Sequence, residues 1–405
     1  MTLQLRGGRE NRLEIGVLHG FRALMVLFVA NFHFWQQGWL PQYFTVLGVQ
    51  IDADFFTRAS YLFVDGMMLL SGFLLYLPYA RHRAEGTPEP LASRFYVNRL
   101  IRILPSYLFS VLTCLLLFAL PQGQYASAGA RNLDVLTHLT FTFTFFRNCY
   151  QFTPINGVLW TIAIEMQFYL VFPLLARAAR KHLTLTLVLM ALAGIGYRAF
   201  VSLRVPDTAM YINQLPSFLD VYALGMLGAV AYCGLQKQLA DMGRVERRCV
   251  SAAALVVFAL SLPCLLALLG AQSTASLAGQ EALRLSQLRL RLPLALTLLA
   301  CMLAAAHMPA LVRKLLDNRL MRFLSTISFN FYIWHQFLAV RMARSWFSTD
   351  ALHADHGLQC AYTLLCWSVS IVVAMLATYG IEKPAARLAN RTLDQLEKRR
   401  QAKPD

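Results

Sequence analysis

The sequence contains little charge, and this shortage excludes a water-soluble domain. Only 14% of its 405 residues are Asp, Glu, Lys or Arg, whereas soluble domains carry about 25%. Hydrophobic residues make up 57% of the chain, and the mean hydropathy is +0.49. The 27 Phe, 16 Tyr and 6 Trp exclude a disordered chain as well, because such chains carry few large apolar side chains. The composition therefore predicts a polytopic membrane protein.

Metal-binding and disulfide patterns are also missing. The eight cysteines show no CxxC and no Cys/His spacing, and most lie within apolar runs. We expect them to pack as small hydrophobic side chains and predict no metal site. They are Cys114, Cys149, Cys233, Cys249, Cys264, Cys301, Cys360 and Cys366. The chain also has no internal repeat and no Gly/Ser linker, which predicts one membrane domain over residues 1–384 and a basic cytoplasmic tail over 385–405.

Ten apolar runs are long enough to cross a bilayer as helices, which takes about 20 residues at 1.5 Å per residue. They lie near residues 20–37, 60–79, 103–120, 158–176, 183–202, 216–234, 250–270, 291–308, 323–342 and 361–381. An eleventh stretch, near 136–147, is short and rich in Thr, so we expect it to re-enter the membrane or lie at its surface. The runs predict an all-α membrane helix bundle with about ten transmembrane helices.

Lysine and arginine are distributed unequally over the connections between these runs. Of the 37, 26 fall on one side, including Arg6, Arg9 and Arg12, and nine fall on the other. Because cytoplasmic segments carry the excess of Lys and Arg, both termini are predicted to be cytoplasmic. This orientation accounts for the net charge of +16, and nucleic-acid binding is not predicted. Three arginines between 284 and 291 fit least well and suggest an amphipathic segment before the eighth run.

The N-terminus has neither a small-residue cleavage site nor a transit-type composition. We therefore expect the first run to remain in the mature protein, and a bacterial inner membrane is the predicted location.

Arg22 and His33 lie in the first apolar run, eleven residues apart. Eleven steps of about 100° return to within about 20° of the start and span roughly 16 Å. Both side chains should therefore face one path through the protein, with Arg22 at the cytoplasmic entrance. Taken singly, Arg22 is better explained as an interfacial anchor and His33 as a core imidazole held by a neighbour. Their shared face favours a functional pair, because ionisable groups in a bilayer are costly.

Arg99 and Arg102 are three residues apart and share a helical face. Guanidinium groups bind phosphates through paired hydrogen bonds, so this face suits a polyanionic ligand at the membrane surface. Anchoring of the cytoplasmic side explains the two arginines equally well.

Glu165 and Tyr169 lie one turn apart in an apolar run that begins near Trp160. An ionisable acid in such a helix should face the bundle interior and find a cationic or hydroxyl partner. Trp160 would alternatively belong to an interfacial aromatic belt. Asp65 and Arg198 are further buried charges, and the sequence does not indicate their partners.

Ser328, Tyr332 and His335 fall at i, i+4 and i+7 of a later run, on one helical face. This face would hydrogen-bond either a ligand or a neighbouring helix.

Together and in this order, these segments resemble the acyltransferase-3 family of integral membrane acyltransferases. The matching residues are Arg22 and His33, Asp65 with Ser71-Gly72-Phe73, Arg99 and Arg102, Trp160 with Glu165 and Tyr169, Ser328 with Tyr332 and His335, and Glu382-Lys383-Pro384. Two departures stand out. His19 occupies a position where the family commonly has Asp, and Met67 and Met68 follow Gly66 where aromatic residues are usual.

The resemblance implies transfer of an acyl group, often acetyl, from cytoplasmic acyl-CoA to a hydroxyl of a glycan, lipid-linked or other acceptor. His33 is then the candidate general base, because a neutral imidazole suits proton removal near neutral pH. Glu165 or His335 would support it, and the sequence does not choose between them.

The same resemblance implies roles for the remaining candidates. Arg22, Arg99 and Arg102 would bind the donor, and four residues would contact substrate: Asp65, Trp160, Tyr169 and Tyr332. Membrane lipids are the expected surroundings, and no oligomeric state is indicated. The alternative is a proton-coupled secondary transporter or exporter, since buried Arg, His, Glu and Asp also form relays. A transporter would more readily show pseudo-symmetric halves, and the sequence shows none.

Overall fold

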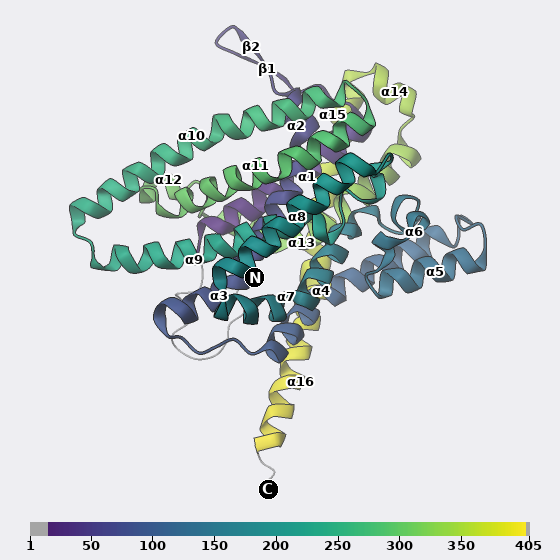
Figure 1. Ribbon diagram of the computed structural model, residues 1–405. Coiled ribbons are helices and arrows are strands. Elements are labelled where there is room, and N and C mark those ends of the chain that lie inside the picture. Colours follow the sequence, from purple (N-terminus) through teal and green to yellow (C-terminus); the bar gives the residue numbers. More distant parts are fainter. Residues whose placement is uncertain (1–14, 402–405) are drawn as a thin grey trace.

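The structure is a computed structural model that describes residues 15–401. Arg6, Arg9 and Arg12 lie outside these residues. The long helices gather in one bundle, and α5 (Ala128–Leu139) and α6 (Arg147–Gln151) lie at its edge (Figure 1). Helix α16 (Lys383–Gln401) extends away from the bundle (Figure 1). The bundle helices are α1 (Val17–Gly38), α3 (Phe63–Glu85), α4 (Ala92–Cys114), α7 (Trp160–Lys181), α8 (Leu183–Arg204), α9 (Leu219–Asp241), α10 (Arg244–Ser276), α11 (Gln280–His307), α13 (Arg319–Trp346) and α15 (His356–Ala377).

The predicted all-α membrane bundle is confirmed. Within residues 15–401, nine helical segments are long and apolar enough to cross a membrane. The ninth predicted run, 323–342, corresponds to α13, which has 28 residues but is too polar to meet the same criterion. Its polar side chains, including Ser328, Asn330 and His335, are buried inside the bundle. Neighbouring helices, and not lipid, therefore surround this face of α13.

The eighth run begins earlier than predicted. Helix α11 starts at Gln280, so the arginines between 284 and 291 belong to the helix itself and not to a separate segment before it. The apolar stretch near 136–147 forms the end of α5 and short turns beside it.

A two-stranded antiparallel hairpin follows α1 and was not predicted. Strand β1 (Tyr43–Val46) pairs with β2 (Val49–Asp52), and Leu47 and Gly48 form the turn with positive φ angles of 50° and 80°. The hairpin projects from the bundle near α2 (Asp54–Ala59) (Figure 1).

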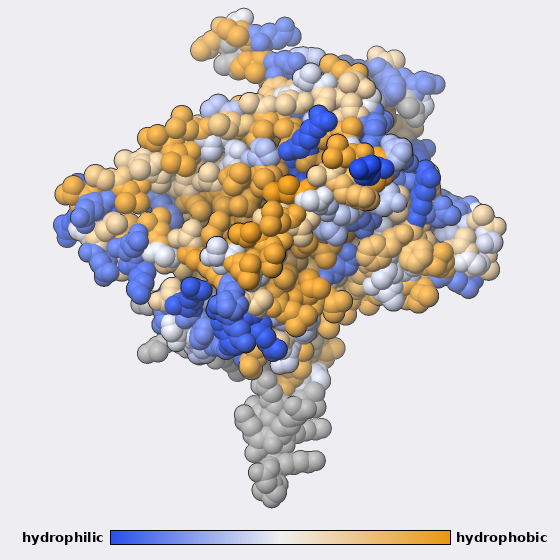
Figure 2. Space-filling model, in the orientation of Figure 1, coloured by the Kyte–Doolittle hydropathy of each residue, from blue (hydrophilic) through white to orange (hydrophobic). Residues whose placement is uncertain are grey.

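The surface agrees with a membrane location. Apolar side chains cover the middle of the visible face, and hydrophilic side chains gather toward its upper and lower ends (Figure 2). Helix α10 contributes exposed Val256, Leu260 and Leu266. Such a band is what a bilayer requires, because lipid offers no hydrogen-bond partners to polar groups.

Helices α3 and α9 approach each other closely through glycine. A Cβ atom added to Gly225 would lie 2.3 Å from the Leu69 carbonyl oxygen, and one added to Gly72 would lie 2.6 Å from the Tyr222 carbonyl oxygen. Small residues at such contacts let two membrane helices pack backbone against backbone.

The Gly225→Ala variant should therefore be less stable, by about 1–3 kcal/mol, because its methyl group must push the two helices apart. Thermal unfolding in detergent measures the change. Gly234→Ala is the matched control on the same helix, since no atom lies within 4 Å of its added Cβ. That control should be neutral or more stable, because Ala favours helix by about 1 kcal/mol over Gly. Equal unfolding temperatures of Gly225→Ala and Gly234→Ala would contradict the close contact between α3 and α9.

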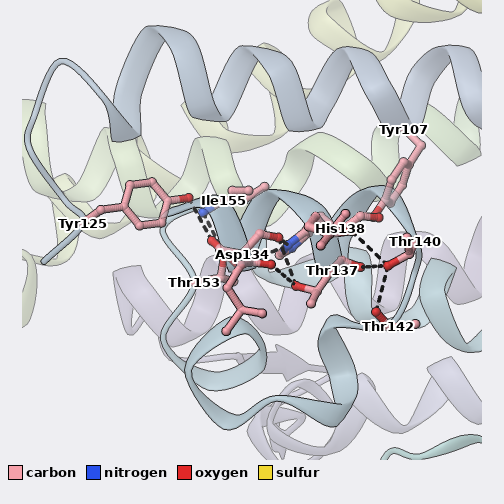
Figure 3. A network of polar contacts seen from close by, with 11 residues as sticks. Tyr107, Tyr125, Asp134, Thr137, His138, Thr140, Thr142, Thr153 and Ile155 are labelled. Atoms are coloured by element: carbon pink, nitrogen blue, oxygen red, sulfur yellow. Dashed lines mark hydrogen bonds and ion pairs between the residues drawn. The ribbon is translucent and has the colours of Figure 1, made fainter. Parts of the chain in front are cut away.

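A polar cluster around Asp134 holds α5 against the bundle (Figure 3). The Tyr125 hydroxyl and the Thr153 hydroxyl each donate to the Asp134 carboxylate at 2.8 Å. The buried His138 ring stacks on Phe143 at 4.0 Å between centroids. Burial and the hydrogen bond to Asp134 raise the pKa of the Tyr125 hydroxyl, so it stays protonated and continues to donate.

Candidate functional site

A cavity of about 100 Å³ opens between α1, α3, α4, α7 and α13. Its polar lining residues are Arg22, Ser71, Arg99, Arg102, Thr161, Glu165, Tyr169, Ser328 and Tyr332. The structure therefore brings together six of the ten predicted site residues, which are spread over more than 300 positions of the sequence: Arg22, Arg99, Arg102, Glu165, Tyr169 and Tyr332. The cavity is the candidate functional site.

Three arginines make one part of this cavity strongly basic. Arg99 and Arg102 lie one turn apart on α4, as predicted, and Arg22 faces them from α1. The Arg99 guanidinium carbon lies 5.5 Å from the centre of the Tyr169 ring and 5.6 Å from that of Phe95. All three arginines are only partly exposed, so their charges are poorly screened by water. The arrangement suits an anionic ligand with several oxygen atoms.

Glu165 has the hydroxyl partner that the sequence predicted. The Tyr169 hydroxyl donates to the Glu165 carboxylate at 3.2 Å, one turn further along α7. The charge of Glu165 also interacts with Arg22 and Arg99. One carboxylate thus balances part of the positive charge in the cavity.

Glu382 lies close to the same arginines, although the sequence suggested no role for it. It is 3% exposed, and Asn330 of α13 donates to its carboxylate at 2.7 Å. Its charge interacts with Arg102 and Arg22. Three guanidinium groups and two carboxylates leave this region with a net positive charge. The Glu-Lys-Pro motif marked this residue in the sequence, but only the packing of the turn Thr378–Glu382 against α4 and α13 relates it to the arginines.

His33 and His335 lie beyond the cavity and not in its lining. Their ring centres are 5.2 Å apart, and the His335 ring lies 5.4 Å from that of Tyr332, which does line the cavity. The expectation of one open path from Arg22 to His33 is therefore wrong for this structure. On α1 and α13, the lining residues nearest the histidines are Val26 and Tyr332.

The hydrogen bonds of the two histidines define which ring nitrogen carries the proton. His335 Nδ1 donates to the Tyr332 carbonyl oxygen at 2.7 Å, because a carbonyl oxygen only accepts. His33 Nδ1 likewise faces the Gln36 amide oxygen at 3.3 Å. Both neutral rings then present an unprotonated Nε2. His335 is fully buried, whereas His33 is partly exposed, so His33 is the more accessible base.

The structure separates Asp65 from the cavity. Arg291 Nε donates to the Asp65 carboxylate at 3.1 Å, and both side chains are almost completely buried. Arg291 also donates to the Ile212 carbonyl at 2.7 Å and to the Ser217 hydroxyl. Asp65 therefore belongs to a buried ion pair and does not line the cavity.

Arg198 has a comparable partner in Asp220. Two guanidinium nitrogens of Arg198 donate to the two Asp220 oxygens, each at 2.6 Å. Trp160 also lies outside the cavity lining, and its ring stacks on Phe218 at 6.2 Å between centroids. These contacts hold the helices together around the site.

The two departures from the family pattern have visible positions. His19 Nδ1 lies 3.1 Å from the Ser325 hydroxyl, so a histidine–serine contact stands where an acid is usual. Met67 and Met68 both line the cavity, where flexible thioether side chains replace aromatic rings. Within residues 15–401, no group of His, Cys, Asp or Glu side chains is arranged to hold a metal ion.

A membrane helix bundle with a basic, hydroxyl-lined cavity defines the class of integral membrane proteins with a polar site inside the bundle. Residues 15–381 match the family model of an acyltransferase domain, which is nearly the whole chain. The protein belongs to the acyltransferase-3 family and is a membrane acyltransferase. No curated protein and no solved structure matches the chain.

Proposed function

We propose that this protein transfers an acyl group, acetyl in the simplest case, from cytoplasmic acyl-CoA to a hydroxyl of a glycan, lipid-linked or other acceptor. The observation that carries the proposal is the convergence of Arg22, Arg99 and Arg102 on one cavity whose far end adjoins the His33–His335 pair. Membership of the family supports an enzyme over the proton-coupled transporter.

The arginines would bind the phosphates of CoA. Each guanidinium offers parallel N–H donors that match phosphate oxygens. The distribution of Lys and Arg supports a cytoplasmic position for this end of the cavity, where acyl-CoA is available. The pantetheine arm would extend along α1 toward Tyr332, which brings the thioester close to the histidines.

His33 would act as the general base. Its Nε2 accepts the proton of the acceptor hydroxyl while that oxygen attacks the thioester carbonyl carbon. The carbon–sulfur bond then breaks, and the proton passes from His33 to the departing CoA thiolate. For this step, Tyr332 must move or the acceptor must reach past it. His335 lies beside His33, whereas Glu165 is hydrogen-bonded to Tyr169. This position supports His335, and not Glu165, as the residue that orients the base.

The acceptor would approach His33 from the non-cytoplasmic side, so that acyl transfer needs no transport of the donor. A bacterial inner membrane is the proposed location.

Arg102→Ala should raise the KM for acyl-CoA roughly tenfold to a hundredfold and change kcat little, since each charge-assisted hydrogen bond contributes about 1.5–3 kcal/mol. Release of free CoA by the purified protein, measured by chromatography, gives both constants. Arg102→Lys should recover part of the affinity, because the charge remains without the paired donors. Arg177→Ala is the control, as Arg177 is exposed on α7 and outside the cavity. An unchanged KM in Arg102→Ala would contradict the assignment of this end to the donor.

A further inference from the structure

The last turn of α1 holds a glutamine next to the candidate base. Gln36 follows His33 by three residues, so the two side chains are neighbours on the surface of the helix. The Gln36 amide oxygen lies 3.3 Å from His33 Nδ1. Because an amide oxygen only accepts, Nδ1 carries the hydrogen of this bond. His33 is partly exposed and Gln36 is exposed, so the pair lies at the surface of the bundle.

The backbone of the turn that carries Gln36 is held in place. The Trp39 N–H donates to the Trp35 carbonyl oxygen at 2.7 Å and closes the helix end. Gly38 packs so tightly against α15 that an added Cβ would lie 2.5 Å from a ring carbon of Tyr362. The hydrogen bond to His33 therefore has to order only the Gln36 side chain, which keeps its entropic cost low.

His335 is the titratable group that faces the His33 ring from α13, with ring centres 5.2 Å apart. Neutral His335 carries one hydrogen, on Nδ1, and donates it to the Tyr332 carbonyl oxygen at 2.7 Å. His335 thus has no N–H left to give to His33. Gln36 is therefore the neighbour that determines which nitrogen of His33 is protonated.

The charged groups of the neighbouring helix α2 are paired with each other. Arg58 binds Asp54, and its guanidinium carbon lies 4.8 Å from the centre of the Trp35 ring. Within residues 15–401, no carboxylate interacts with the charge of His33. The pair of His33 and Gln36 thus lacks a counter-charge, so the effect of an added one can be measured.

We infer that Gln36 is the positioning residue of the base: it binds the Nδ1 hydrogen of His33 and thereby keeps Nε2 unprotonated for the acceptor hydroxyl. A neutral imidazole has one hydrogen, so holding it on Nδ1 raises the share of His33 in which Nε2 accepts a proton. The imidazolium formed during transfer is then stabilised by an amide dipole and not by a carboxylate. The inference rests on the proposed function, because it concerns His33 as the base.

Nitrogen-15 NMR of the full-length protein in detergent, labelled at histidine, tests the hydrogen bond directly. The measurement is made at about pH 8, above the usual pKa of imidazole, and the His33 signals are those lost in His33→Ala. In the wild type, His33 should carry its hydrogen on Nδ1. In Gln36→Leu, the share with the hydrogen on Nε2 should rise to about half or more, because the acceptor for Nδ1 is gone. A wild-type His33 with its hydrogen mainly on Nε2 would overturn the inference.

Kinetics test the consequence for the base. Gln36→Leu should lower kcat for CoA release from acetyl-CoA roughly threefold to tenfold. Its KM should change little, because Gln36 lies outside the cavity lining. Gln36→Glu places a carboxylate beside the imidazole, which favours the protonated form. A protonated base cannot accept a proton, so the acidic limb of the pH profile of kcat/KM should move up by roughly half a unit to one unit.

Gln50→Glu is the matched control, because it adds the same charge on the exposed strand β2 and should leave the pH profile unchanged. Gln36 is exposed, so its variants should unfold at the wild-type temperature. If the wild type neither binds acetyl-CoA nor releases CoA from it, the proposed function fails, and the role of Gln36 fails with it. If the wild type is active, His33→Ala is not, and both Gln36 variants keep the wild-type kcat and pH profile, the proposed function stands and the role of Gln36 is overturned.

Discussion

Replacing His33 with alanine should reduce acyl transfer by about 10²–10⁴-fold while acyl-CoA still binds, because general base catalysis contributes this much to a rate. His33 is not part of the cavity lining, so its removal leaves the donor contacts of Arg22, Arg99 and Arg102 in place. The measurement pairs transfer kinetics with calorimetric binding of acetyl-CoA on the same preparation.

The controls for this variant distinguish the base from its surroundings. His182→Ala alters an exposed histidine between α7 and α8. It should leave the rate of acyl transfer and the affinity for acetyl-CoA unchanged. His335→Ala should lower kcat less than His33→Ala, because His335 orients the base and does not itself take the proton. Glu165→Gln should act mainly on KM, since Glu165 lies among the arginines. Wild-type turnover in His33→Ala would exclude His33 as the base.

Replacing Arg291 with leucine should destabilise the protein by about 3–5 kcal/mol, which is the usual cost of leaving one member of a buried ion pair without its partner. Arg291 is fully buried, and Asp65 is 1% exposed, so water cannot replace the lost guanidinium. The Ile212 carbonyl and the Ser217 hydroxyl lose a donor in the same substitution. Thermal unfolding in detergent reports the loss.

A double variant tests whether the charge left behind causes this loss. Asp65→Leu combined with Arg291→Leu should be more stable than Arg291→Leu alone, because no unpaired carboxylate remains. Arg284→Ala is the matched control on α11, since its contacts with Asp207 and Glu281 are partly exposed and should be worth about 0–1 kcal/mol. Equal stability of the single and double variants would show that lost packing, and not the uncompensated charge, dominates.

The sequence by itself determined the features that depend on neighbours within one helix. The apolar runs predicted the membrane bundle because hydrophobic length is a local property. Helical spacing also predicted that Arg99 and Arg102 share a face, that Glu165 meets Tyr169 and that Ser328 and Tyr332 point the same way. Each of these pairs lies within about one helical turn, so the backbone geometry alone brings them together.

Only the tertiary structure decided which helices meet and where space remains between them. Asp65 and Arg291 are 226 positions apart, and their pairing depends on the packing of α3 against α11. The same packing removed Asp65 from the cavity lining, whereas the packing of α1 against α13 brought His33 beside His335. Helical periodicity states the direction in which a side chain points, whereas the surfaces of several helices together determine what it meets there.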